Sequence, residues 1–557
     1  MDNFQIADNF SLLSKLIDIH GENSFKSKSY AVAAFNIEKL PAPLSSLPAD
    51  KIFGIKGIGD AIGKKILEII ETGKLQALEE YLQKTPQGLV EMLNIKGLGP
   101  KKIAVIWKEM SIESVGELLY ACNENRLLLY KGFGEKTQSN VKSYIEFYLR
   151  SKGSYLYAEI EPYAADMQQQ LQKQFPEHRF EITGAFKRQA TTIDVLEWVT
   201  TANIQMLKEY FTAQSFTAAD EDALKITFTS PDNTHIRFYF SQKENFGSIL
   251  FHTRCSAAFL NEWESIYPGS TVYENEAQVF EAVSIPYILP CLREKENIIQ
   301  IAKQNKLPEL IQPSDIKGII HSHSNWSDGV HTVEEMANGA IKMGYEYLVL
   351  SDHSKSAFYA NGLKEDRIKE QHLYIDELNE KLKPFKIFKS IEADILNDGN
   401  LDYSNDVLAT FDLVIASVHS NLKMTEEKAM MRILGAIQNP YTTILGHPTG
   451  RLLLSREGYP VDHKKMIDAC VSNNVVIELN AHPRRLDIDW TWIDYAVAKG
   501  AMISIDPDAH AVDGFKDTRF GVLAAQKAGV TKNNNLSSFS LNEMEDYLQK
   551  IKTKKNL

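Results

Sequence analysis

The spacing of hydrophobic residues changes character along the chain. Up to about residue 150, apolar positions recur every three or four residues, which predicts an all-α region. From about 155 to 255, short runs such as LKITFTS and HIRFYFS surround one helical stretch, which predicts an α+β domain. Residues 256–312 read as a helical connector that contains prolines. After Pro313, strand-like and helical segments alternate, which predicts a (β/α) barrel.

Three segments of the helical region repeat one pattern. Each has a Lys, then Gly-x-Gly, then a helical apolar pattern, and the region is therefore predicted to consist of helix–turn–helix units. The segments are IKGIGDAIGKKILEII from Ile55, IKGLGPKKIAVIWKEM from Ile95 and YKGFGEKTQSNVKSYI from Tyr130.

The strand-like runs of the predicted barrel end in potential metal ligands. They are GIIHSH, YLVLSDH, KSIEAD, LVIASVH, TTILGH, VVIELN and MISIDPDAH, and six of these ends carry His, Glu or Asp. Residues at the carboxyl ends of barrel strands face the catalytic end of such a fold. A His-x-His on a strand places both imidazoles on one face, because side chains repeat every two residues.

Composition narrows the class of protein. The chain has 557 residues, 44% of them hydrophobic and 24% charged, which is typical of a multidomain globular protein. Its four cysteines lie far apart, which favours free thiols in a reducing cytosol. The sequence predicts neither a signal peptide nor a membrane span. A net charge of −12 argues against a large basic surface, so any DNA contact must be local.

Seven of the 14 histidines fall in the strand-end set or the loop after the first strand. Imidazoles with a few carboxylates and no Cys suit zinc, manganese or iron better than magnesium. Asp352 is expected to orient a ligand histidine, whereas His331 and His482 are expected not to bind metal. The predicted ligands are His321, His323, Asp328, His353, Glu392, His419, His447, Asp508 and His510.

This segment resembles the PHP (polymerase and histidinol phosphatase) domain over about residues 313–545. The motifs HSHSNWSDG, SDHSKS, IEADILNDG, ASVHS, GHPTGRLL and DPDAH carry the resemblance. It implies three divalent metals, with Glu392 shared by two of them and catalytic. The three implied ligand groups are His321, His323, Glu392 and Asp508; Glu392, His419 and His447; and Asp328, His353 and His510.

Clustered metals activate water and clamp the oxygens of a phosphodiester, so no side-chain nucleophile is needed. Arg451 is predicted to be catalytic through contact with the substrate phosphate, and Arg484 is a second candidate. For both arginines, a purely structural ion pair is the alternative.

The glycine loops resemble helix–hairpin–helix motifs, which grip DNA backbones without reading sequence. Glycine allows close approach to a phosphate, and the helix that follows presents free N–H groups to it. Lys56, Lys96 and Lys131 add local positive charge. Helix-capping glycines in protein packing are the alternative. The residues predicted to bind DNA here are Gly57, Gly59, Gly97, Gly99, Gly132 and Gly134.

Residues 24–83 resemble the lyase-type domain of family X DNA polymerases, through SFKSKSYAVAAFNI and GIGDAIGKKILEII followed by ETGKL. The family's Schiff-base lysine falls on Lys65, and Lys26 falls on a contact to a 5′-phosphate. An amine forms an imine with an abasic sugar only if its pKa is depressed. A DNA-facing or solvated Lys65 is therefore the main expectation, with a lyase nucleophile as the alternative.

Residues 155–290 resemble the palm and thumb of bacterial family X polymerases, but the catalytic motifs differ. The nucleotide-binding Gly-Ser becomes Gly184-Ala185, and Asp-x-Asp becomes Thr192-Ile193-Asp194. The third aspartate aligns with Arg237, and the stretch from Ile236 to Gln242 holds no Asp or Glu. Nucleotidyl transfer needs two magnesium ions held by carboxylates, so we predict a degenerate polymerase site without activity.

The whole chain thus resembles a bacterial family X polymerase fused to a PHP domain. The predicted domains are 1–85 (lyase-like), 86–152 (fingers-like), 153–255 (degenerate, nucleotidyltransferase-like palm), 256–312 (contracted thumb and linker) and 313–557 (PHP, a distorted barrel).

The resemblance implies a cytoplasmic, nucleoid-associated and monomeric DNA-repair protein. Its expected activity is that of a 3′-5′ exonuclease, phosphodiesterase or abasic-site endonuclease, supported by manganese, on gapped, nicked or 3′-ended DNA without sequence specificity. The alternatives are a phosphatase of the histidinol-phosphate kind, a non-catalytic DNA-end scaffold and an active gap-filling polymerase.

Overall fold

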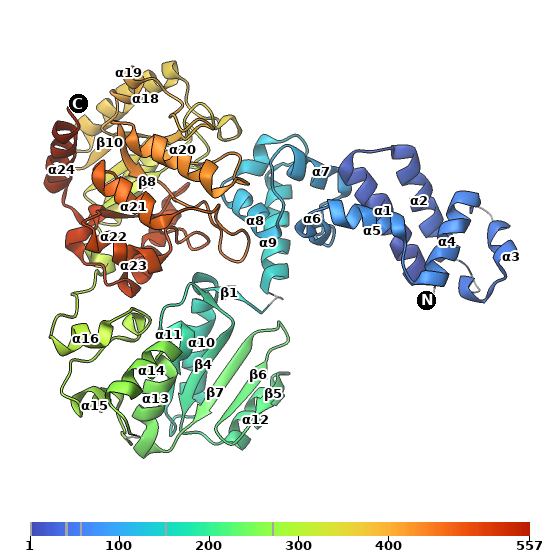
Figure 1. The fold of residues 1–557 in the computed structure, drawn as a ribbon, viewed down its shortest axis with the longest axis horizontal. Coiled ribbons are helices and arrows are strands. Elements are labelled where there is room, and N and C mark those ends of the chain that lie inside the picture. The colour runs from blue at the N-terminus through green and yellow to red at the C-terminus, as the bar shows by residue number, and fades with distance from the viewer. Residues whose placement is uncertain (1–2, 39, 41–42, 56–57, 151–152, 270–271) are drawn as a thin grey trace. The chain divides into compact units, whose positions relative to one another are not determined.

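The computed structural model describes residues 3–557 except 39, 41–42, 56–57, 151–152 and 270–271 (Figure 1). The chain divides into two compact units. The first comprises Met1–Asn123 with Tyr130–Tyr148, and the second comprises Glu124–Leu129 with Leu149–Leu557. The finer division into five domains stays a prediction.

The first unit is built from helices, as the hydrophobic pattern predicts. Its long opening helices pack through apolar positions three and four residues apart, such as Ile6, Phe10 and Leu13 on α1, which are all buried. The helices are α1 (Asn3–His20), α2 (Ser24–Glu38), α3 (Ala49–Phe53), α4 (Asp60–Thr72), α5 (Gln76–Lys84), α6 (Gln87–Met92), α7 (Pro100–Lys108), α8 (Val115–Asn123) and α9 (Glu135–Arg150).

The first part of the second unit is the expected α+β domain. It contains a five-stranded sheet of order β2-β4-β7-β6-β5 and a small antiparallel pair, β1 with β3. The strands are β1 (Tyr155–Leu156), β2 (Phe180–Thr183), β3 (Thr192–Ile193), β4 (Val195–Thr200), β5 (Thr217–Glu221), β6 (Lys225–Thr229) and β7 (His235–Phe240). The helices are α10 (Tyr157–Gln174), α11 (Gly184–Lys187), α12 (Ile204–Ala213), α13 (Phe246–Arg254), α14 (Ala257–Ile266), α15 (Glu276–Glu281) and α16 (Ile298–Lys303).

The two faces of this sheet carry different helices. Leu196 and Trp198 of β4 share a core with Leu171 of α10 and Phe211 of α12. The alternate residue Val199 points to the other face, where it packs against α13. The sheet is therefore covered on both sides, which explains why its central strands are so apolar.

The remaining residues form a parallel seven-stranded barrel that is nearly closed, and the predicted fold class is confirmed. The sheet order is β14-β13-β12-β11-β10-β9-β8, with helices outside the strands (Figure 1). The strands are β8 (Gly318–Ser322), β9 (Tyr347–Leu350), β10 (Lys386–Asp394), β11 (Leu413–Ser417), β12 (Thr442–Leu445), β13 (Val476–Asn480) and β14 (Ile503–Asp506). The helices are α17 (Val333–Lys342), α18 (Glu365–Lys381), α19 (Asn405–Leu408), α20 (Glu426–Gln438), α21 (His463–Ser472), α22 (Trp490–Ala498), α23 (Thr518–Lys527) and α24 (Leu541–Lys554).

Alternation along β9 explains how the barrel is filled. Leu348 and Leu350 pack outward in the cluster that contains Met336 of α17, whereas Tyr347 and Val349 join the inner cluster. The first and last strands meet beyond their ends, where the main-chain N–H of His323 donates to the carbonyl of Ala509 at 2.9 Å. The residues that close the barrel therefore lie in two of the segments that carry predicted metal ligands.

Among the helices in the described part of the chain, none is both long and apolar enough to span a membrane.

Candidate metal centre

All nine predicted ligands lie at the carboxyl ends of barrel strands or in the loops that follow. Parallel strands place these ends at one rim, so side chains distant in sequence converge there. β8, β9 and β10 contribute His321, His323, Asp328, His353 and Glu392. β11, β12 and β14 contribute His419, His447, Asp508 and His510.

Glu392 lies at the middle of the cluster. Its Oε1 is 2.9 Å from His447 Nε2 and 3.1 Å from His419 Nε2. The same oxygen is 3.3 Å from His321 Nε2, while its Oε2 is 2.9 Å from His353 Nδ1. One carboxylate thus contacts four imidazoles through both of its oxygens, which suits a group that bridges two cations.

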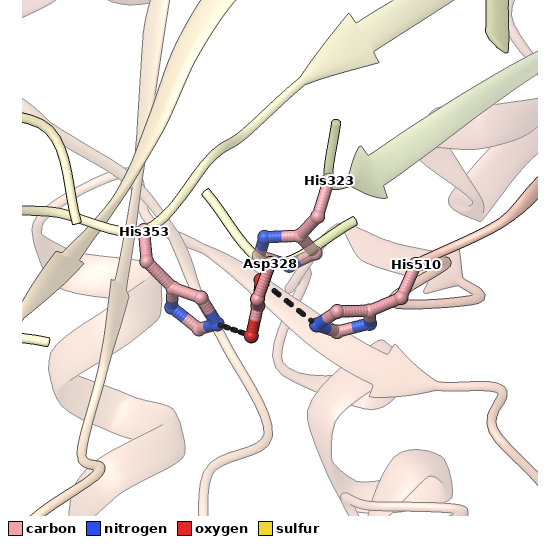
Figure 2. A group of neighbouring side chains, drawn as sticks. All are labelled: His323, Asp328, His353 and His510. Atoms are coloured by element: carbon pink, nitrogen blue, oxygen red, sulfur yellow. Dashed lines mark ion pairs between the residues drawn. The ribbon is translucent and has the colours of Figure 1, made fainter. Parts of the chain in front are cut away.

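A second group surrounds Asp328. Figure 2 shows the imidazoles of His353 and His510 on either side of this carboxylate, with His323 close to both. His353 Nε2 and His510 Nε2 each lie 3.5 Å from an oxygen of Asp328. His323 stacks on His510 with ring centroids 4.2 Å apart, and its Nε2 is 3.1 Å from Asp508.

Ligand atoms within 4.8 Å of one another form three groups in the described residues. The groups are His323, Asp328, His353 and His510; His321, His323 and Asp508; and His353, Glu392 and His419. They overlap the groups implied by the PHP resemblance but share His323 and His353 between neighbours. The assignment of each ligand to one ion therefore stays a prediction.

Divalent metal ions fit this centre on the chemistry of its donors. Within the described chain, buried Asp328 Oδ2, Glu392 Oε2 and His510 Nε2 make no hydrogen bond. Buried polar atoms are normally satisfied, and a cation would satisfy these lone pairs. His321 and Asp508 also adopt positive φ angles of 58° and 51°. Such backbone strain is concentrated at functional sites.

Buried imidazoles and carboxylates lie close together in this centre and shift one another's pKa values. Burial lowers the pKa of His321, but Glu478, Asp508 and Glu392 outweigh it and raise that pKa well above its usual value. Burial, with His510 and His353 nearby, lowers the pKa of His323 to about 3. A histidine must be neutral to bind a metal, so ion binding here is coupled to proton release.

Two carboxylates that orient ligand histidines escaped the sequence reasoning. Glu478 on β13 accepts a hydrogen bond from His321 Nδ1 at 2.5 Å and another from the main-chain N–H of His447 at 2.5 Å. Asp394, at the end of β10, accepts from His419 Nδ1 at 2.5 Å. Glu478 follows a buried run and Asp394 lies two residues after Glu392, so their positions at strand ends were the available signal.

Asp352 has a different place from the one expected. Its carboxylate accepts hydrogen bonds from Ser324, Ser327 and Gln371 rather than from a histidine. It therefore holds the loop that carries Asp328. His331 and His482 each accept a hydrogen bond from a main-chain N–H through Nδ1. Both placements agree with a structural role.

The arginines near the centre make other contacts than those predicted from the sequence. Arg451 donates to the main-chain carbonyls of Arg485 and Leu486 and to the Asp489 carboxylate. All three of its nitrogens thus hold a loop, which favours the structural alternative over the predicted catalytic role. Arg484 pairs with Glu159 at 2.5 Å. Arg485, which the sequence did not single out, is nearest to the ligands, with Nε 3.7 Å from Asp508.

The glycine loops of the first unit precede helices as predicted. Gly59, Gly99 and Gly134 stand directly before α4, α7 and α9, while Gly57, with Lys56, lies outside the described residues. Gly97 and Gly132 have φ angles of 96° and 98°, which other residues rarely adopt. A Cβ on any of the five described glycines would meet no atom within 4 Å, so these loops are open. Lys65 is half-buried on α4.

In the α+β domain, the substituted positions lie around β4. Asp194 follows Thr192 of β3 and accepts a hydrogen bond from Ser154 at 2.6 Å. Strand register places Arg237 beside Glu197, three residues beyond Asp194, with 3.5 Å between their charged groups. Gly184, which precedes Ala185 on α11, has a φ of 66°, and a Cβ there would collide with Glu197.

Comparison with known proteins assigns the family. Residues 1–75 match the helix-hairpin-helix domain family, and residues 89–144 match the SAM-like helix-hairpin-helix tandem family. Over 96% of its length the chain is 31% identical to the DNA polymerase/3′-5′ exonuclease PolX of Bacillus subtilis (strain 168), covering 97% of that protein. The chain belongs to the bacterial PolX family.

The carboxyl-terminal part of this PolX-family chain has relatives of its own. It is 27% identical over 260 residues to a probable phosphatase of Thermoanaerobacter sp. (strain X514), covering 98% of that protein. A probable phosphatase of Caldanaerobacter subterraneus is 28% identical over 171 residues. The resemblance to family X polymerases and to PHP-type phosphoesterases is thus confirmed, and both the family and the helix-hairpin-helix matches indicate DNA binding.

Proposed function

We propose that this PolX-family protein processes DNA ends through its PHP centre, as a metal-dependent 3′-5′ exonuclease or phosphodiesterase. The observation that carries the proposal is the convergence of nine buried or half-buried His, Asp and Glu side chains, with Glu392 at the middle of the group. The relative from Bacillus subtilis bears the name of a polymerase and 3′-5′ exonuclease.

The side chains of the centre would hold three divalent cations, with zinc, manganese or iron favoured by the imidazole ligands. Such ions activate water as a nucleophile near neutral pH and neutralise the charge of a phosphodiester. Glu392 would contact two of the ions through its two oxygens. Glu478 and Asp394 would keep His321 and His419 in the orientation that binds metal.

DNA is the proposed substrate because the first unit carries the open glycine loops. Their glycines leave space above the amino-terminal ends of α4, α7 and α9, where free N–H groups favour phosphate. Gapped, nicked or 3′-ended DNA without sequence preference is the expected form, since such contacts read the backbone alone. Lys65 would face this DNA, and a lyase role for it stays an alternative.

Polymerase activity is proposed to be absent. Thr192 cannot ligate magnesium as an aspartate does, and Asp194 already accepts a hydrogen bond from Ser154. Glu197 is the carboxylate beside Arg237, but it is bonded to that arginine and to the Tyr239 hydroxyl at 2.8 Å. Two magnesium ions therefore lack a carboxylate pair at this position.

The test uses purified full-length protein, 5′-labelled gapped DNA and Mn²⁺, beside a His321→Ala/His323→Ala variant. The wild-type chain should shorten the 3′ end, and the variant should not. Equal cleavage by both proteins contradicts the assignment. In the same reactions, dNTPs should give no extension of the primer.

A phosphatase acting on small phosphomonoesters is the second candidate, because the probable phosphatases match the barrel part alone. Release of phosphate from histidinol phosphate, without cleavage of DNA, would favour it over the nuclease.

A further inference from the structure

A short hairpin on the barrel follows the ligand His447. The main-chain N–H of Leu452 donates to the carbonyl of Arg456 at 2.8 Å, and the N–H of Arg456 donates back to Leu452 at 2.8 Å. Leu453, Leu454 and Ser455 therefore form the tip.

Hydrogen bonds tie this hairpin to the metal centre at two points. At its base, the N–H of Gly450 donates to the carbonyl of His447 at 3.0 Å. At its tip, the N–H of Leu453 donates to the carbonyl of Arg484 at 2.6 Å. Arg484 precedes Arg485, whose Nε lies 3.7 Å from the ligand Asp508. The hairpin is thus fixed to the loops that carry ligands from β12 and border those from β14.

Leu454 is an unusual residue for such a tip. Its φ of 57° is a backbone conformation that leucine rarely adopts, yet its side chain is 46% exposed. A glycine or asparagine would fit this turn with less strain. Backbone strain is concentrated at functional sites, and Leu454 stands seven positions after the ligand His447.

The hairpin also lines a hollow. A cavity of about 420 Å³ is bounded by Arg451–Gly458. This volume is in the range of pockets that hold small organic ligands. Its lining combines the apolar surface of the three leucines with the polar groups of Ser455 and Arg456. A nucleoside offers the matching pair of surfaces, an apolar base face and a polar sugar.

A second exposed apolar side chain borders the same centre. Val330 is 57% exposed, and its main-chain N–H donates to the carbonyl of the ligand His510 at 2.8 Å. An exposed apolar residue after β8 is thus bonded to a ligand residue, and a second one, Leu454, lies on the hairpin whose base is bonded to the ligand His447.

We propose that the hairpin Leu452–Arg456 is the nucleoside-binding subsite of the PHP centre, with Leu454 packing against the base next to the scissile phosphate. This inference rests on the proposed nuclease function and adds what that function lacks, a surface that recognises the nucleoside while the ligand cluster takes the phosphate. Base stacking on a side chain is tolerant of sequence, as an exonuclease requires.

The experiment compares three substrates with the full-length protein and Mn²⁺. They are a 5′-labelled oligonucleotide with a normal 3′-terminal nucleotide, the same strand ending in an abasic analogue, and bis(p-nitrophenyl) phosphate. Leu454→Ala should lower kcat/KM on the normal end about tenfold, as expected when a base covers the exposed part of a leucine side chain. It should leave the abasic end and the chromogenic diester unchanged. Leu454→Met should restore cleavage of the normal end.

Two further variants separate the side chain from the backbone. Leu454→Gly relieves the positive φ and should show the same selective loss as Leu454→Ala. Leu373→Ala removes a leucine that is 66% exposed on α18 and should behave as wild type on all three substrates. An equal loss on all three substrates, or none on the normal end, overturns the subsite. Failure of the wild-type chain to cleave any phosphodiester refutes the proposed function itself, and the subsite with it.

Discussion

Glu478 should control metal affinity although it is not a predicted ligand. Its side chain is fully buried on β13, with Oε1 2.5 Å from His321 Nδ1 and Oε2 2.5 Å from the main-chain nitrogen of His447. One carboxylate thus fixes the ring of one ligand and the backbone of another. We expect Glu478→Gln to weaken metal binding without changing the fold.

The magnitude follows from the two hydrogen bonds. Both partners are N–H donors, and a carboxylate accepts from both, whereas a glutamine amide accepts through its oxygen and presents N–H groups on the other side. One donor therefore meets another donor. A hydrogen bond to a charged group contributes roughly 1.5–3 kcal/mol. The loss corresponds to roughly 10- to 100-fold in metal affinity, the usual range for partners of metal-bound histidines.

The assay is a titration of metal-free protein with Mn²⁺, followed by calorimetry and by diesterase activity. Glu478→Gln should shift both midpoints to higher metal concentration, while saturating metal restores most activity. Glu334→Gln, at an exposed glutamate of α17, is the matched control and should titrate as wild type. An unchanged affinity in Glu478→Gln would refute the orienting role.

Three further changes probe other parts of the chain. Burial raises the pKa of Asp517 from 3.8 to about 7. The folded chain therefore binds this proton more tightly than the unfolded chain, and the contribution of Asp517 to stability is fully present below about pH 4 and is lost as pH rises to about 7. Thermal melts at several pH values should show that Asp517→Asn abolishes this loss of unfolding free energy, which is on the order of 4 kcal/mol. Replacing the fully buried Lys527, 2.5 Å from Glu294, by Met should lower the free energy of unfolding by about 1.5–3 kcal/mol in thermal unfolding, the contribution of one hydrogen bond to a charged group, because Arg188 still pairs with Glu294 at 2.8 Å. Gly132→Ala should weaken nonspecific DNA binding in fluorescence anisotropy more than Gly134→Ala, because only Gly132 needs a positive φ. Equal effects of these two substitutions would contradict that reasoning.

Much of the barrel could be predicted because its strands and its chemistry coincide. The runs that end in His321, His353 and His419 are buried strands, so the hydrophobic pattern and the ligand positions support one another. The roles of single side chains could not be predicted in this way. The role of Glu478 follows from the N–H groups of His321 and His447, which meet its carboxylate only in the folded chain.

For Arg451, the sequence suggested a role that its contacts in the structure do not favour. Its motif suggested a contact with phosphate, but the carbonyls that its guanidinium binds belong to residues 485 and 486, more than thirty positions away. Sequence spacing carries no information about such a pairing, whereas the barrel brings the two loops together. Arg485 becomes the guanidinium nearest to the ligands for the same reason.

The α+β domain supplies partners to buried cations of the barrel. Lys527 of the barrel is fully buried and donates to Glu294 and to the carbonyl of Arg188, while Arg484 of the barrel pairs with Glu159. Both cations are therefore buried where the barrel and the α+β domain meet, and groups of the α+β domain compensate their charge. Arg484 lies beside Arg485 and bonds the hairpin that follows His447, so the same contact supports the loops around the metal ligands. The α+β domain thus supports the barrel independently of nucleotidyl transfer, because it holds the loops through which a PHP centre would meet its substrate.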